Sequence, residues 1–211
     1  MLDPILKNLL RGITVIEDDF GAINAIISKQ LGAYAVTNGK KVCFLAPPSN
    51  SSSIAEGDGD ESSGIEIASE EELVNTGASS QKNAVVYRTD KRYLPLEQLN
   101  FDIIVFESFS TYVFGMSEKE VLDLMEELAK LSKQGKSFVL TSEAPMLDGR
   151  INAYIRASAD TVIIVRADIA QGKINRTLYI PKMIGTKPTD RLIKITVEDD
   201  GVSIDTREMV G

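Results

Sequence analysis

Four carboxylates directly follow predicted β-strands, and they are the side chains best placed to do chemistry: Glu17, Asp18, Glu107 and Glu143. The carboxyl ends of parallel strands meet at one edge of a sheet, where open α/β proteins bind their ligands. Glu107 and Glu143 are therefore expected to lie near one another. Two such carboxylates can support acid–base or metal chemistry. An enzyme that uses this pair is one alternative, against which stands the fact that no other reactive side chain is aligned with them.

The composition excludes several other chemistries. The chain has no histidine, which removes imidazole bases, Ser-His and Cys-His nucleophiles and His-ligated metals. The single cysteine, Cys43, excludes an internal disulfide and favours a cytoplasmic protein. No apolar run reaches the roughly 20 residues of a membrane helix, and the N-terminus lacks a signal-peptide pattern. We therefore expect no metal site and no membrane partner.

Alternating strand and helix patterns predict the elements that position these carboxylates. Short β-branched runs predict strands at 13–16, 41–46, 83–87, 103–106, 137–141 and 161–165. Helical spacing predicts helices at 2–11, 23–36, 69–76 and 149–157. A further helix is predicted behind the capping box of Ser117 and Glu120, and it ends at Gly135 after the apolar stripe Val121, Leu124, Met125, Leu128 and Leu131. A turn at 170–173 and short strands at 174–180, 192–197 and 202–204 end the chain. The pattern predicts one α/β domain over 1–211, a mainly parallel sheet flanked by helices, with C-terminal antiparallel strands.

Charge is distributed unevenly along the chain. The net charge is −8, and eight acids lie between Lys41 and Lys82 with no basic residue among them. Residues 49–64 are so rich in Ser, Gly, Asp and Glu that we predict a mobile loop. Stretch 166–194 is basic, with seven Lys or Arg against two Asp. It is either solvated surface charge or a patch for nucleic acid.

The order of elements and four local strings resemble the KaiC/RadA branch of the RecA superfamily. The strings are 101–110, 138–143, 159–163 and 176–186, and the resemblance spans nearly the whole chain. It implies a RecA-like, P-loop NTPase-type fold and an archaeal source. It places Glu107 and Ser108 at the Walker B strand, Ser142 and Glu143 at the sensor strand, and Lys182 in a late Lys-Met-Arg-Gly-Thr motif.

The same resemblance locates a phosphate-binding loop that lacks the required residues. An active loop reads Gly-x-x-x-x-Gly-Lys-Ser/Thr, in which backbone amides hold the phosphates, Lys neutralises them and the hydroxyl holds Mg²⁺. Here Asp18 and Ile23 stand at the glycines, Asn24 at the lysine and Ala25 at the hydroxyl residue. Of the loop's glycines only Gly21 is present, at an interior position.

Further family positions are also altered. Glu107 replaces the Walker B Asp, Pro47 and Pro48 stand where the catalytic Glu is expected, and Ile184 replaces the late Arg. Glu17 and Asp18 are expected to point at the phosphates and repel them. Glu107 is interpreted as a relic, as a partner of Lys182, or as a ligand contact.

Three hypotheses about function follow. The first is a non-enzymatic pseudo-ATPase without cofactor, an assembly or regulatory subunit in a homo- or hetero-oligomer with a RecA-like or other protein partner. The second is a RadA/KaiC-like paralogue in DNA repair or signalling that still binds ATP and Mg²⁺. The third is the carboxylate enzyme described above. The remaining alternative is that the chain is an ordinary βαβ protein whose similarity to the family arose by chance.

Phe109, Tyr112 and Phe114 are expected to pack in the core or at a subunit interface rather than to stack on bases.

Overall fold

The computed structural model of the 211-residue chain describes most of the predicted elements. The described residues are 10–19, 22–47, 65–68, 83–89, 94–170, 172–185, 192–198 and 201–204. Predicted helices 2–11 and 69–76, the predicted loop 49–64, and Gly21 lie wholly or almost wholly outside them.

The described elements largely follow the predicted order, although no helix is described between residues 42 and 106. The strands are β1 (Ile13–Asp18), β2 (Val42–Ala46), β3 (Ile65–Ala68), β4 (Ala84–Arg88), β5 (Ile103–Phe106), β6 (Ser137–Glu143), β7 (Thr161–Ala170), β8 (Lys173–Met183), β9 (Ile193–Glu198) and β10 (Gly201–Ile204). The helices are α2 (Ala22–Thr37), α4 (Phe109–Val113), α5 (Glu118–Lys133), the 3-10 turn η2 (Ala144–Met146) and α6 (Gly149–Ser158).

One sheet joins all ten described strands in the order β10-β9-β8-β7-β1-β6-β5-β2-β4-β3. The seven strands from β7 to β3 are parallel, and β8, β9 and β10 are antiparallel to their neighbours. The prediction of a mainly parallel sheet with antiparallel C-terminal strands is confirmed.

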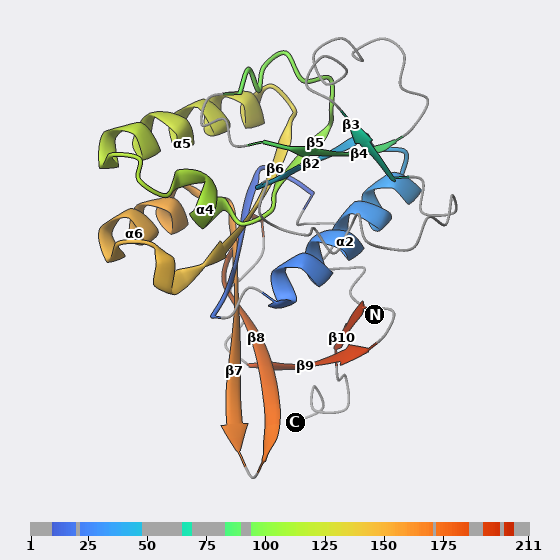
Figure 1. The fold of residues 1–211 in the computed structure, drawn as a ribbon, viewed down its shortest axis with the longest axis vertical. Coiled ribbons are helices and arrows are strands. Elements are labelled where there is room, and N and C mark those ends of the chain that lie inside the picture. The colour runs from blue at the N-terminus through green and yellow to red at the C-terminus, as the bar shows by residue number, and fades with distance from the viewer. Residues whose placement is uncertain are drawn as a thin grey trace.

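Helices cover both faces of this sheet, and each central strand therefore buries both of its faces. Figure 1 shows α4, α5 and α6 together on one side and α2 on the other. Within β1, Val15 belongs to the core under α5 and α6, while Ile16 belongs to the core under α2. This alternation explains why the strands are continuous apolar runs, as expected for parallel sheets covered on both faces.

Helix α5 begins where its sequence signal predicts. The Ser117 hydroxyl accepts a hydrogen bond from the Glu120 amide, and the Glu120 carboxylate accepts one from the Ser117 amide at 2.7 Å. Val121, Met125 and Leu128 on its inner face are buried. The capping box and the amphipathic stripe thus fix one helix on the sheet.

Gly12 precedes β1 at a position that excludes a side chain. Its φ is +72°, and an added Cβ would lie 2.0 Å from Asp160 Oδ2. That same oxygen accepts the Ile13 amide at 2.8 Å, so Asp160 ties the start of β1 to the turn before β7. A glycine is required here for its backbone conformation and for the space it leaves.

We predict that Gly12→Ala lowers the free energy of unfolding by about 2–3 kcal/mol, since strain and displacement of Asp160 add together. Gly135→Ala is the matched control: its φ is +102°, and no atom lies within 4 Å of the added Cβ. We expect it to cost about 1 kcal/mol, from backbone strain alone. Urea unfolding of both variants measures the difference, and equal losses would contradict the proposed contact.

Candidate functional site

The carboxyl edge of the sheet brings the sequence-predicted residues together. Strands β1, β6 and β5 are neighbours, so Asp18, Glu143 and Glu107 come from three adjacent strand ends. Helix α2 starts four residues after β1, with its first amides at the same edge. This is the edge where doubly wound folds bind ligands, and a helix N-terminus there attracts anions.

The anion at the start of α2 is the protein's own Asp18. Its Oδ2 accepts a hydrogen bond from the Ile23 amide at 3.0 Å, and the residue is only 2% exposed. Ile23 is the second residue of α2, so this amide is one of those that no helical carbonyl can satisfy. A carboxylate at this position also interacts favourably with the helix dipole. Asp18 therefore occupies the kind of position in which a phosphate would be bound.

Glu17 does not face this position, contrary to the expectation that both acids point at a phosphate. It lies on the opposite face of β1, where its carboxylate accepts hydrogen bonds from Nε of Arg156, at 2.5 Å, and from Nη2 of the same residue. Glu17 is fully buried, and this hydrogen bond raises the pKa of Arg156. Because successive strand residues alternate faces, the two acids have different partners and do not add up to one repulsive charge.

The third acid of the segment, Asp19, has its own partner. Its Oδ1 lies 2.8 Å from Nη1 of Arg166 on β7. Both side chains are about one-third exposed, so this pair contributes little to stability. Each acid in 17–19 thus has an identified partner, and only Asp18 lies at the start of α2.

Asn24, at the position of the P-loop lysine, joins α2 to β6. Its Nδ2 donates to the carbonyl of Ser142 at 3.3 Å, and the residue is 3% exposed. Its Oδ1 has no partner among the described residues. Ile23 is buried in the core beneath α2, and Ala25 is half-buried. These three side chains supply contacts between helix and sheet and no positive charge.

Glu107 is buried without the partner suggested for it. It is 8% exposed, and its Oε1 has no hydrogen-bond partner among the described residues. Burial raises the pKa of Glu107 to about 7, against the opposing effect of the Arg88 charge. The suggested pair with Lys182 is wrong, because Lys182 Nζ donates to the carbonyl of Ala157 at 2.7 Å, at the end of α6.

Glu143 is held by hydroxyl groups that follow Glu107 in sequence. Ser108 Oγ donates to Glu143 Oε2 at 2.9 Å, and Ser110 Oγ also donates to it. The Ser108 amide donates to Thr141 Oγ1 at 2.8 Å. Glu143 is therefore a structural acceptor in a hydroxyl cluster rather than one half of a reactive pair with Glu107. Among the described residues, no group of three His, Cys, Asp or Glu could hold a metal ion.

Ser108 is the only described non-glycine residue with a positive φ. Its φ of 60° and ψ of 64° lie in the left-handed region, which is unfavourable for most side chains. The hydroxyl network with Glu143 and Thr111 holds it there.

Sequence reasoning missed Ser110, Thr111 and Arg156, although the run of hydroxyls directly after Glu107 was a usable signal.

The aromatic residues after β5 divide between core and surface. Phe109 is fully buried, and Tyr112 packs edge-on against Phe106 with ring centroids 5.1 Å apart. Phe114, which ends α4, is 64% exposed. Core packing is confirmed for the first two, while Phe114 lies on the surface.

The basic stretch 166–194 is partly engaged within the protein. Arg166 pairs with Asp19, and Lys182 binds the end of α6. Residues 186–191 lie outside the described residues. The other described cations of this stretch are Lys173 and Arg176 on β8 and Lys194 on β9.

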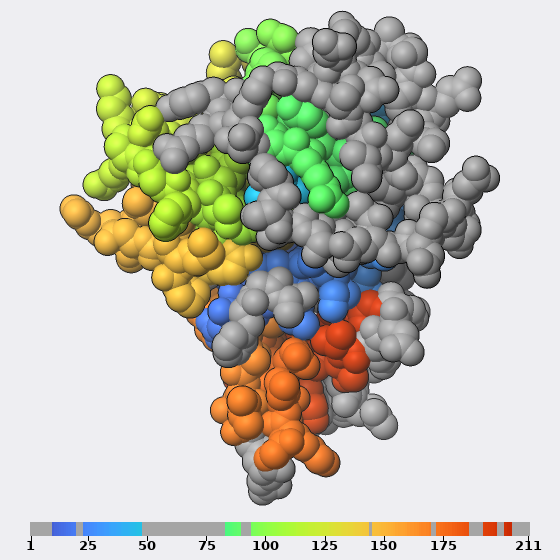
Figure 2. All heavy atoms as spheres, viewed as in Figure 1, coloured from blue at the N-terminus to red at the C-terminus, as the bar shows by residue number. Residues whose placement is uncertain are grey.

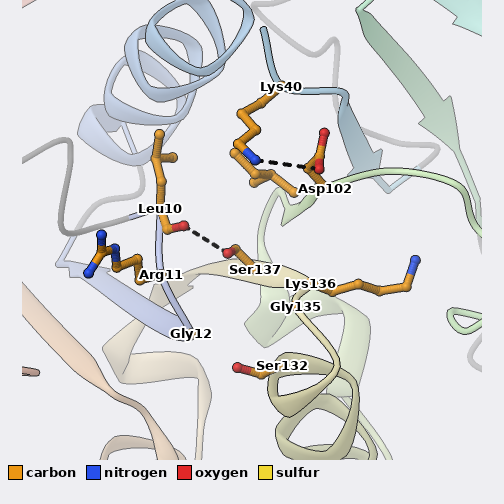
Figure 3. A pocket seen from close by; sticks show the side chains of 10 residues that line it. Leu10, Arg11, Gly12, Lys40, Asp102, Ser132, Gly135, Lys136 and Ser137 are labelled. Atoms are coloured by element: carbon orange, nitrogen blue, oxygen red, sulfur yellow. Dashed lines mark hydrogen bonds and ion pairs between the residues drawn. The ribbon is translucent and has the colours of Figure 1, made fainter. Parts of the chain in front are cut away.

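A separate cavity of about 260 Å³ lies at the amino edge of the sheet (Figure 3). Lys40 Nζ lies 3.6 Å from Asp102 Oδ1, so the charges nearest to each other compensate. In Figure 3 the charged ends of Arg11 and Lys136 extend to opposite sides, away from Ser137. The cavity therefore does not concentrate charge on one point.

Comparison with solved structures identifies the architecture. The crystal structure of flagellar accessory protein FlaH from Methanocaldococcus jannaschii superposes with a TM-score of 0.67 at 17% identity, over 96% of this chain and 95% of that one. The KaiC-like protein PH0186 from Pyrococcus horikoshii OT3 gives a TM-score of 0.61 at 12% identity, over 92% and 89%. The fold is RecA-like, of the KaiC type. The resemblance inferred from the four sequence strings is confirmed at the level of fold.

Other comparisons give no match. No protein-family model and no curated protein matches this sequence. None of the described helices is long and apolar enough to cross a membrane.

We predict that Arg156→Met lowers the free energy of unfolding by about 3 kcal/mol, because Glu17 is left buried without its countercharge. Adding Glu17→Gln to that variant removes the buried charge, and we expect it to restore part of the loss. Chemical denaturation of the wild type, both single variants and the double variant gives the coupling energy. Strictly additive effects would contradict the pairing.

We predict that Glu107 makes the protein less stable as pH rises from about 4.5 to 7. The folded pKa of about 7 exceeds the ordinary value of 4.5, so between these values the folded state keeps a proton that the unfolded state has lost. Stability should fall over this window by up to about 3 kcal/mol and be level above it. Glu107→Gln should remove that slope, which thermal unfolding at several pH values can measure. Parallel pH profiles for wild type and variant would overturn the assignment.

Proposed function

We propose that this chain is a non-catalytic RecA-like protein that acts through protein–protein contacts as an assembly or regulatory subunit. The observation that carries the proposal is the hydrogen bond from the Ile23 amide to the Asp18 carboxylate at 3.0 Å. An amide that would bind a phosphate in a P-loop is satisfied here by the protein itself.

Electrostatics supports this reading of the loop. A phosphate that approached α2 would meet the Asp18 carboxylate, and at ~4 Å with an effective dielectric constant of ~20 such a contact costs on the order of 4 kcal/mol before screening. Displacing Asp18 would also give up a helix cap worth about 1 kcal/mol. Asn24 supplies no positive charge to offset either cost.

The chemistry of hydrolysis lacks its residues as well. Ala25 has no hydroxyl for Mg²⁺, and Ile184 stands exposed where the family resemblance implies an arginine. Glu107, at the Walker B position, is buried with a raised pKa, which disfavours the charged form near neutrality. A protein that keeps the fold without these groups can still offer its surfaces to partners. The FlaH-like architecture fits this class of role, since that protein is called a flagellar accessory protein.

We predict that the wild-type protein gives no binding heat with Mg-ATP up to millimolar ligand, and no phosphate release. Asp18→Gly combined with Asn24→Lys and Ala25→Ser removes the internal anion and restores the lysine and the hydroxyl, so we expect binding to become detectable. Isothermal titration calorimetry tests both proteins.

Asp19→Gly is the matched control, because it removes an acid of the same segment that pairs with Arg166 and not with α2. We expect it to bind no more ATP than the wild type. Micromolar ATP binding by the wild type would overturn the proposal and favour a nucleotide-binding paralogue.

A further inference from the structure

The β7–β8 hairpin extends beyond the sheet as a two-stranded ribbon. Strand β7 pairs with β1 only from Thr161 to Val165, and β8 pairs with β9 only from Arg176 to Leu178. The far ends of both strands therefore pair only with each other. Figure 1 shows this hairpin projecting from the body of the molecule at the bottom of the view.

The end of the ribbon carries two exposed aliphatic side chains. Ile169 and Ile174 are directly opposite one another across the two strands, and they are 75% and 55% exposed. Directly opposed residues share a face of an antiparallel pair, and Arg176, two positions on, lies on that face as well. Burying such a side chain is worth about 1.5–3 kcal/mol, so leaving a pair exposed is unfavourable unless another surface covers them.

A second apolar surface lies at the end of α4. Phe114 at the end of α4 is 64% exposed, and Met146 in the neighbouring turn η2 is 44% exposed. Helix α5 begins four residues after Phe114, and its first ten residues hold one lysine among five acids: Glu118, Glu120, Asp123, Glu126 and Glu127. We call the surface of Phe114 and Met146 the Phe114 patch; the first turn of α5, which follows Phe114 in sequence, carries Glu118 and Glu120.

We propose that the hairpin tip of one copy docks on the Phe114 patch of a second copy. The apolar groups match, and the positive charge of Arg176, on the same face as the two isoleucines, meets Glu118 and Glu120 at the start of α5. In Figure 1 the hairpin tip lies far from α4 and α5, so one chain cannot make this contact with itself. The contact is therefore head-to-tail and builds rings or filaments rather than closed two-fold dimers.

A second copy fits this surface better than nucleic acid does. The protein carries a net charge of −8, and Asp168 lies beside Ile169 at the end of the ribbon. Two isoleucines give little to a phosphate backbone, whose binding is driven by cations. The inference rests on the proposed assembly role and specifies the surface and the partner.

The first test is the size of the wild-type protein at up to about 100 µM, where a micromolar contact is mostly formed. Sedimentation velocity should show species larger than a dimer. We expect Ile169→Thr with Ile174→Thr, which keeps β-branched residues in the ribbon, to weaken association at least about tenfold. Phe114→Ser should do the same. Leu192→Ser, at an equally exposed leucine outside both surfaces, should leave association unchanged.

The decisive experiment mixes the hairpin variant with the Phe114 variant. Each retains one intact surface, so an equimolar mixture of the Ile169/Ile174 variant and the Phe114 variant should form dimers and nothing larger. Circular dichroism of each variant checks that the fold is intact.

Several outcomes would overturn the inference. These are a monomeric wild type, a mixture that stays monomeric, or loss of association in Leu192→Ser alone. Fluorescence anisotropy with single-stranded DNA tests a further outcome. If the double variant Ile169→Thr with Ile174→Thr loses DNA binding but still self-associates, the hairpin is a nucleic-acid site. None of these outcomes bears on ATP binding, so failure here is distinguishable from failure of the proposed pseudo-ATPase role.

Discussion

The hydrogen bond between Asp18 and the Ile23 amide determines how the rest of the carboxyl edge is arranged. It places a fixed negative charge at the start of α2, where a RecA-like fold would present free amides to a phosphate. In the proposed function, a lysine at residue 24 would have no phosphate to neutralise. Asn24 instead bonds to the carbonyl of Ser142 and holds α2 against β6. The edge has become a set of internal contacts.

Strand alternation explains how three consecutive acids are accommodated at this edge. Glu17 faces α6 and pairs with Arg156, Asp18 faces α2, and Asp19 reaches Arg166 on β7. Each carboxylate therefore ties β1 to a different element. The same edge holds Glu143 in a hydroxyl cluster, so Glu143 acts as a structural acceptor like Glu17 and Asp18, whereas Glu107 Oε1 has no hydrogen-bond partner among the described residues.

Local signals predicted the fold well, and long-range pairing limited the prediction of the site. Strand 103–106 and the capping box at Ser117 depend on neighbouring residues, and both were predicted correctly. The Glu17–Arg156 pair joins residues 139 positions apart, which no local pattern reveals. Asp18 could have been found, since an Asp shortly before a helix is a capping signal. Helix α4 was missed because its aromatic and β-branched residues are weak helix formers.

The amide signal of Ile23 reports whether Asp18 keeps its position at the start of α2. In ¹⁵N-labelled protein we expect this resonance to shift in Asp18→Ala, because the carboxylate acceptor is gone, and to stay fixed in the wild type during a Mg-ATP titration to millimolar ligand. That result would mean that the protein's own carboxylate holds the anion position. Saturable movement of the Ile23, Asn24 and Ala25 amides in the wild type would instead show that a phosphate displaces Asp18 and that the loop still binds nucleotide.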